Sequence, residues 1–185
     1  MSDELTNALT EHHDVAARMR DVLPHAADAA RALIAAYERG GRVYTFGNGG
    51  SSADAAHFAE ELIGRFKRER RPLAAQSLSI DASALTCIAN DYSYDEVFER
   101  QVRGFVRDGD VVIGFSTSGR SPNVVRGLAA ARELGAVTVL FTGHDGGEAD
   151  LVLAVPSEST ARIQEMHVLL LHLILEEVDR WAAGS

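Results

Sequence analysis

Five short apolar runs alternate with longer amphipathic segments over residues 41–185. The runs are short enough for single strands and lie at residues 42–46, 74–80, 111–115, 137–141 and 151–155. The other segments have apolar residues at helical spacing and lie at 52–66, 83–89, 94–106, 121–134 and 160–181. Strands that alternate with helices favour right-handed crossovers and a parallel sheet that is covered on both faces. We therefore expect an α/β fold with a doubly wound, flavodoxin-like sheet of about five parallel strands.

The first forty residues have apolar side chains at helical spacing throughout, including Leu5, Leu9, Leu23 and Leu33. Pro24 either separates two helical segments or starts the second one. Gly40 and Gly41 then end the region, as glycines do at helix C-termini. The chain is therefore expected to consist of an N-terminal helical region, residues 1–40, and an α/β domain, residues 41–185.

Charge and composition narrow the classes of function. The chain has 27 acidic and 18 basic side chains and a net charge of −9, which argues against nucleic acid or an acidic membrane as a partner. A single cysteine, Cys87, excludes an intramolecular disulfide; we expect it to be a small buried apolar residue. The polar, acidic start and the absence of a long apolar run predict a cytoplasmic protein without a membrane span. The basic run 65–71 is expected to be a solvated loop, or more weakly a rim that attracts anionic substrates.

Two polar loops follow predicted strands, where ligands of open parallel sheets collect. The glycine loop, residues 47–52, reads GNGGSS; Ser51 or Ser52 is expected to cap the next helix, with Asp54 completing a capping box. The serine loop, residues 116–122, reads STSGRSP, with Ser121 as the expected cap before Pro122. Free N–H groups at the helix starts and clustered hydroxyls could hold a phosphate monoester. Both loops could also be simple capped turns, and the glycine loop is only a weak match to a dinucleotide fingerprint.

Two pairs of polar side chains lie on the neighbouring predicted helices. His57 and Glu61 are four residues apart and therefore share a helix face. Gln164 and His172 are eight residues apart, so both side chains could only just reach one small ligand. Alternatively, they serve sites that another subunit helps to shape. Their nitrogen and oxygen donors suit a divalent metal such as zinc. The alternatives are a surface pair at His57 and Glu61 and a core histidine at His172. Two further groups have a simpler interpretation: Asn90 and Asp91 could form a helix-ending turn, and the histidines at 12, 13, 25, 144 and 167 are expected to be surface or packing residues.

Several stretches together resemble one known family. These are GNGGSSADAAHFAEEL, the pair Asn90-Asp91, STSGRSPNV, TGHDGG and RIQEMHVLLLH. They resemble the sedoheptulose-7-phosphate isomerases, also called phosphoheptose isomerases, which belong to the sugar isomerase (SIS) domain group. The resemblance covers nearly the whole chain. The serine loop is common to many SIS domains, whereas the glycine-loop helix combined with the last motif is more specific.

The resemblance implies a role for each matching residue. Glu61 and His172 are implied as the catalytic acid/base pair. The implied zinc ligands, for one ion per subunit, are His57, Glu61, Gln164 and His172. The implied substrate-binding residues are Asn48, Gly49, Gly50, Ser51, Glu61, Asn90, Asp91, Ser116, Thr117, Ser118, Ser121 and Gln164. The family also implies a homotetramer with active sites at subunit interfaces, in which residues 1–40 would serve oligomerisation.

The reaction that the resemblance implies is an aldose–ketose isomerisation. Sedoheptulose 7-phosphate would become D-glycero-D-manno-heptose 7-phosphate through an enediol, with Glu61 as base and His172 as acid. The metal could organise the site, take part in catalysis or leave when substrate binds. Two other classes stay open: a non-catalytic relative that binds the replication initiator protein, and a phosphosugar-binding module.

Overall fold

The computed structural model describes residues 3–144 and 146–184. Its centre is a five-stranded, fully parallel sheet in the order β2-β1-β3-β4-β5. The strands are β1 (Val43–Gly47), β2 (Ala75–Ser77), β3 (Val111–Ser116), β4 (Val137–Thr142) and β5 (Leu151–Ala154). The predicted α/β fold with a doubly wound parallel sheet is thus confirmed. The second strand is shorter than expected, because Ser79 turns out of the sheet and exchanges hydrogen bonds with the backbone of Gly47.

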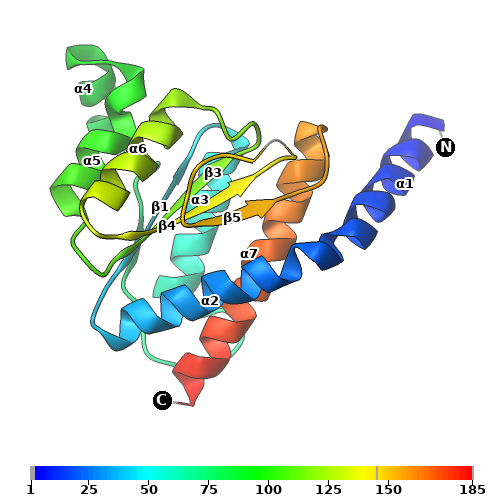
Figure 1. The fold of residues 1–185 in the computed structure, drawn as a ribbon, viewed down its shortest axis with the longest axis horizontal. Helices are drawn as coiled ribbons and strands as arrows, with labels where there is room; N and C mark the ends of the chain where they lie inside the picture. Colours follow the sequence, from blue (N-terminus) through cyan, green and yellow to red (C-terminus); the bar gives the residue numbers. More distant parts are fainter. Residues whose placement is uncertain (1–2, 145, 185) are drawn as a thin grey trace.

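Helices cover both faces of this sheet (Figure 1). One face packs against α2 (Leu23–Glu38), α3 (Gly50–Ile63) and α7 (Thr160–Ala183), and the other packs against α5 (Val97–Phe105) and α6 (Pro122–Glu133). In β3, Val111, Ile113 and Phe115 face the first layer and Val112 faces the second. This alternation follows from the pleat of a strand, which sends successive side chains to opposite faces.

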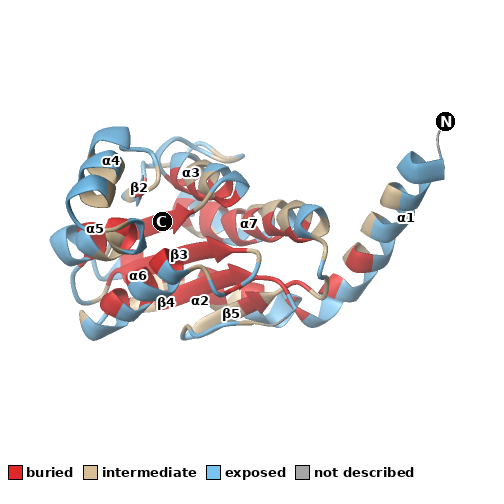
Figure 2. Ribbon diagram, turned by 90° about the horizontal axis from the view of Figure 1, so that it is seen from above, coloured by how far each residue is buried: buried red, intermediate tan, exposed pale blue. Residues whose placement is uncertain are grey.

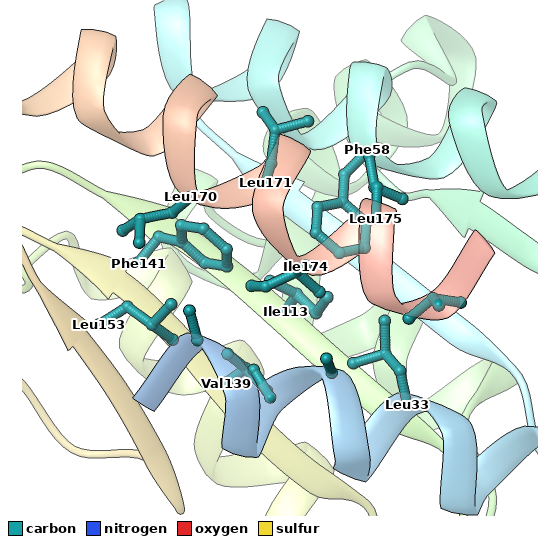
Figure 3. Packing of buried hydrophobic residues seen from close by; sticks show 14 of the residues in the cluster. Leu33, Phe58, Ile113, Val139, Phe141, Leu153, Leu170, Leu171, Ile174 and Leu175 are labelled. Carbon is teal, nitrogen blue, oxygen red and sulfur yellow. The ribbon is translucent and has the colours of Figure 1, made fainter. Parts of the chain in front are cut away.

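The larger core lies under α2, α3 and α7. Figure 3 shows Leu33, Phe58, Ile113, Phe141 and Ile174 meeting there from three helices and two strands, and each is at most 1% exposed. Burying one such side chain stabilises a fold by roughly 1.5–3 kcal/mol. The apolar side of α3 and α7 is therefore fixed firmly, which sets the direction of the polar side chains on the same helices.

The N-terminal region is helical, as predicted. It comprises α1 (Asp3–Arg18), a single 3₁₀ turn at Met19–Asp21, and α2, which has Pro24 in its first turn. Figure 2 shows α1 reaching away from the rest of the molecule, and Val15 is its one buried residue. In the part of the chain that the structure describes, no helix is both long and apolar enough to cross a bilayer.

Several local predictions need correction. Cys87 is exposed rather than buried, because α4 (Ala82–Asp91) has no buried residue at all. The run 65–71 is not simply solvated, since the side chain of Arg70 is 1% exposed and pairs with Asp179. Neither Ser51 nor Ser52 caps α3, which starts at Gly50, two residues earlier than expected, with Gly49 in the cap position.

Other boundaries shift by smaller amounts. The helix expected at 94–106 is a 3₁₀ turn, Tyr94–Glu96, followed directly by α5. Ser121 does occupy the cap position of α6, with Pro122 in the first turn, but its hydroxyl contacts Ser116 and not the helix backbone. His167 is a packing residue, as expected, whereas His12 has a defined partner in Glu165 at 2.8 Å.

Candidate functional site

The glycine loop and the serine loop leave the sheet side by side. They follow β1 and β3, which are hydrogen-bonded neighbours, with Gly47 paired to Phe115 at their carboxyl ends. Asn48 in the first loop and Asn123 in the first turn of α6 exchange two amide hydrogen bonds of 2.8 and 2.9 Å. The hydroxyl of Tyr94 also donates to Asn48 Oδ1, at 2.9 Å. The two loops therefore form one connected surface.

The backbone of the glycine loop requires its glycines. Gly49 has a φ of +55°, in the left-handed region that other residues rarely adopt. A Cβ on Gly47 would lie 2.6 Å from the carbonyl oxygen of Ser51, so a side chain would open the turn. Ser51 itself is buried. The loop thus keeps the first turn of α3 close to the strand end.

Gln164 reaches the glycine loop from α7. A Cβ built on Gly50 would lie 2.4 Å from Gln164 Nε2, so the amide lies directly against the start of α3. Gln164 and His172 are two turns apart on α7, and their side chains therefore meet α3 at different levels. Gln164 connects the glycine loop with the last helix.

The serine loop presents hydroxyls beside two helix starts. Ser116 Oγ and Ser121 Oγ lie 3.1 Å apart, and Ser118 Oγ accepts a hydrogen bond of 3.2 Å from the backbone of Arg120. A cavity of about 310 Å³ opens next to Thr117 and Ser118 and reaches the first turn of α7 at Thr160. The N-termini of α6 and α7 both lie beside this loop, and each carries a partial positive charge. The surroundings suit an anionic group such as a phosphate ester.

His57, Glu61 and His172 form a cluster between α3 and α7. His57 Nε2 lies 3.4 Å from Glu61 Oε1, and the rings of His57 and His172 are 5.2 Å apart, edge to face. One donor atom from each residue lies within 4.8 Å of the others. All three are half-buried. The pKa of His172 is lowered, first by burial and then by the neighbouring His57, which favours the neutral imidazole.

This cluster fits a zinc ion by its donor chemistry. Two imidazoles and one carboxylate are a common protein ligand set for catalytic zinc, which leaves a fourth position for water or substrate. Gln164 lies on the same helix as His172, next to Gly50. Among the implied zinc ligands, the structure thus brings His57, Glu61 and His172 within 4.8 Å of one another.

Asn90 and Asp91 are not part of the His57–Glu61–His172 cluster. They end α4, are exposed, and contact each other at 2.8 Å, with Cys87 Sγ 3.6 Å from Asp91. Figure 1 shows α4 beside α5, at the side of the molecule away from α7.

Sequence patterns missed four residues around the site. Tyr94 and Asn123 bind Asn48, Phe66 stacks on His172 with ring centroids 5.5 Å apart, and Arg70 contacts the end of α3. Asn123 directly follows Pro122, so its place in the first turn of α6 could have identified it. The partners of Tyr94 and Phe66 are far away along the chain, and Arg70 is one of several charges in a basic run, so no local pattern indicates these three residues.

Comparisons with known proteins identify the family of the chain. The sequence model of the SIS domain family matches residues 12–143 of this chain. A phosphoheptose isomerase from Pelobacter propionicus is 46% identical over 97% of this chain and 98% of its own length. The Aquifex aeolicus phosphoheptose isomerase is 51% identical over 82% of each chain.

Solved structures give the same result. A phosphoheptose isomerase from Neisseria gonorrhoeae superimposes with a TM-score of 0.90 at 39% identity, covering 96% of this chain and 98% of that one. One from Francisella tularensis gives a TM-score of 0.93 at 30% identity, over 97% and 100%. Similarity of this extent in both sequence and fold shows that the chain belongs to the phosphoheptose isomerase family of SIS-domain proteins.

Proposed function

We propose that this protein is an aldose–ketose isomerase that converts sedoheptulose 7-phosphate to D-glycero-D-manno-heptose 7-phosphate. Relatives that are 46–51% identical carry the name phosphoheptose isomerase. Within the chain itself, the best support for this proposal is the cluster of one carboxylate and two imidazoles, whose donor atoms lie within 4.8 Å of one another. The two helices that carry them, α3 and α7, both begin near hydroxyl-bearing loops. Such a site can move a proton next to a carbonyl while a distant phosphate is held.

The proposed chemistry is a proton transfer between C1 and C2 through a cis-enediol. Glu61 acts as the base that removes the proton from C1 and then returns it to C2. His172, whose pKa is lowered by burial, donates a proton to the carbonyl oxygen on C2 as negative charge develops there and takes the hydroxyl proton from the oxygen on C1 as the new carbonyl forms. Both side chains stand on rigid helices, so the reacting carbons meet them in a fixed orientation.

The phosphate group is proposed to bind at the serine loop. Ser116, Thr117, Ser118 and Ser121 supply hydroxyls, and the start of α6 supplies backbone N–H groups. Asn48, Gly49, Gly50 and Ser51 of the glycine loop, with Gln164, would surround the sugar. Binding energy at the phosphate would then hold the sugar between Glu61 and His172.

Zinc, one ion per subunit, is the proposed cofactor. His57, Glu61 and His172 would hold it, with Gln164 as the further ligand that the family resemblance implies. Glu61 and His172 would serve as base and acid when they are not bound to the metal, because a ligated carboxylate or imidazole is a poorer proton carrier. Bound zinc supplies Lewis-acid polarisation of a carbonyl oxygen. Elemental analysis of the purified protein should find zinc, and His57→Gln should lose it. Full turnover by protein that contains no divalent metal would contradict this cofactor.

Assembly into homotetramers, with sites completed across subunit interfaces, is also proposed. Leu5 and Leu9 of α1 are 63% and 59% exposed, and the region 1–40 would supply contacts between subunits. Asn90 and Asp91 could then serve the site of a neighbouring subunit. Mixing Glu61→Gln protein with Asp91→Ala protein under conditions that exchange subunits should restore part of the activity. No restoration in tetramers shown to be mixed would argue for sites within single subunits.

The decisive test is turnover itself. Wild-type protein incubated with sedoheptulose 7-phosphate should form the aldose, detected by NMR or by a coupled assay. Glu61→Gln should lower kcat by about 10²- to 10⁴-fold, the usual contribution of a general base, without unfolding the protein. Glu60→Gln is the matched control, because Glu60 is the exposed neighbour on the same helix. Binding of the sugar phosphate without any turnover would instead indicate a phosphosugar-binding module.

The cytoplasm is the proposed location, with no nucleic acid or membrane as a partner. The net charge of −9 supports the second part of this proposal, because an acidic protein repels phosphate backbones and anionic lipids. Retention on a heparin column at physiological salt would contradict this part of the proposal.

A further inference from the structure

The segment between α3 and β2 is attached to α7 by a buried ion pair. The side chains of Arg70 and Asp179 are each 1% exposed, and Arg70 Nε lies 3.2 Å from Asp179 Oδ1. Asp179 Oδ2 accepts a further hydrogen bond of 2.9 Å from the backbone N–H of Arg68. Both the side chain and the backbone of this segment are therefore fixed to the last helix.

Arg70 also holds the end of the helix that carries Glu61. Its guanidinium donates to the carbonyl oxygens of Glu61 at 2.6 Å, Leu62 at 2.8 Å and Gly64 at 3.3 Å. The last carbonyls of a helix have no partner within the helix, and a cation there is favoured by the helix dipole. A single side chain thus joins the C-terminal turn of α3 to Asp179 of α7.

The same segment confines the ring of His172. Phe66 stacks on that imidazole with an interplanar angle of 19°, and His57 meets it edge-on. Lys67 Nζ lies 5.1 Å from the centre of the Phe66 ring and forms an ion pair with Glu176, one turn beyond His172 on α7. The imidazole therefore has a neighbour on its face and another at its edge.

We propose that residues 64–72 form a positioning clamp, in which the Arg70–Asp179 pair fixes α3 against α7 and Phe66 fixes the ring of His172, so that the segment sets the spacing between Glu61 and His172. The proposal rests on the proposed function of these two residues. A buried ion pair is weak evidence for stability, because desolvation of two charges offsets their attraction. The hydrogen bonds from Arg70 to the backbone of Glu61 instead indicate control of geometry.

Two variants separate positioning from folding. Arg70→Met combined with Asp179→Leu replaces both charges by apolar groups, so that neither charge is left buried without its partner. The carbonyl oxygens of Glu61, Leu62 and Gly64 lose their donor, so we expect some fall in the thermal midpoint as well. Phe66→Leu keeps an apolar side chain but removes the flat ring. Glu177→Gln is the matched control, because it removes a carboxylate from an exposed ion pair with Arg180 on the same helix.

The measurements are the thermal midpoint, the imidazole NMR signals of His172, the affinity for Co²⁺, and kcat and KM with sedoheptulose 7-phosphate. His172→Gln assigns the signals. We expect Phe66→Leu to move the His172 signals downfield, because they lose the ring current of Phe66. Both variants should bind Co²⁺ more weakly, and kcat should fall about 10- to 100-fold while KM stays within about twofold. The control should match wild type in each measurement.

Unchanged His172 signals in Phe66→Leu, together with wild-type Co²⁺ affinity and kcat, would overturn the clamp. A fall in thermal midpoint with no change in the His172 signals, the Co²⁺ affinity or kcat would also overturn the clamp, because the Arg70–Asp179 pair would then serve stability alone. The NMR and Co²⁺ measurements do not require turnover. If wild type were inactive on sedoheptulose 7-phosphate, the function would fail while the clamp could still be supported or overturned.

Discussion

Asn48 and Asn123 form a reciprocal pair of amides, in which each Nδ2 donates to the other residue's Oδ1 at 2.8 and 2.9 Å. Asn123 is 2% exposed, so water does not compete for these bonds. The pair joins the loop after β1 to the helix after β3. Any substrate that spans the glycine loop and the serine loop therefore binds to two elements whose separation is already fixed.

Removing this pair should loosen both loops. Asn123→Ala deletes both bonds and leaves the Asn48 amide with Tyr94 alone. We expect the free energy of unfolding to fall by about 1–3 kcal/mol, the cost of unmaking buried hydrogen bonds, measured by urea denaturation. Turnover should fall as well. Tyr94→Phe is the control, because it removes only the exposed bond to Asn48 and should cost less than Asn123→Ala. Equal effects of the two variants would contradict this account.

The serine loop gives a second prediction. Ser118→Ala should raise KM for the sugar phosphate about 10-fold or more, because a hydrogen bond to a charged group contributes roughly 1.5–3 kcal/mol. Its kcat should change much less, since the phosphate is distant from the reacting carbons. Ser52→Ala in the glycine loop is the comparison, because the Ser52 hydroxyl bonds to the carbonyl of Gly49. Steady-state kinetics with unchanged KM for Ser118→Ala would exclude this hydroxyl from phosphate binding.

Much of the fold was predictable from local patterns. The apolar, β-branched runs at β3 and β4 are typical of buried strands. Their alternation with helices then favours a parallel sheet. The two polar loops were also predictable, because the position of a loop after a strand places it at the ligand-binding edge. Helical spacing predicted that His57 and Glu61 share a helix face, and in the structure His57 Nε2 lies 3.4 Å from Glu61 Oε1.

The predictions that were wrong concern residues whose position depends on partners that are distant in the sequence. Cysteine is a residue type that is usually buried, but Cys87 lies on α4, which has no buried residue. No local pattern indicates that this helix lies outside the core. Arg70 looked like one charge among many in a basic run, whereas its partner Asp179 is 109 residues away. Phe66 gave no sign of contact with His172 for the same reason. Tertiary contacts, not propensities, decide these positions.

The contact between Gly50 and Gln164 offers a selective probe of the site. In Gly50→Ala the new Cβ would meet the end of a flexible side chain, so the protein should fold with little change in thermal midpoint. Gln164 must move, however, and a misplacement of about 1 Å can lower turnover up to about 10²-fold. Gly119→Ala is the contrast, because there the Cβ would meet the backbone oxygen of Gly146 at 1.9 Å and φ is +66°. That variant should be strongly destabilised. Wild-type kcat in Gly50→Ala would show that the position of Gln164 is unimportant.

The stability of the fold should depend on pH through His167. This residue is fully buried, and its Nε2 donates to the carbonyl oxygen of Thr142 at 3.2 Å. Burial lowers the pKa of His167 from 6.5 to about 4. The unfolded chain therefore binds the proton more readily, so stability is fully present above pH 6.5 and is lost as the pH falls toward 4. The loss amounts to about 3 kcal/mol at most.

Asp54 acts in the opposite direction, so a variant is needed to isolate His167. Burial raises the pKa of Asp54 from 3.8 to about 6, which means that the folded state binds this proton more readily and stability gains as the pH falls through 6. His167→Gln retains an N–H donor for Thr142 but does not titrate between pH 4 and 7. The free energy of unfolding, measured in urea from pH 7 to 4.5, should fall more steeply with acid in wild type than in His167→Gln. Parallel curves for the two proteins would show that His167 does not contribute to acid sensitivity.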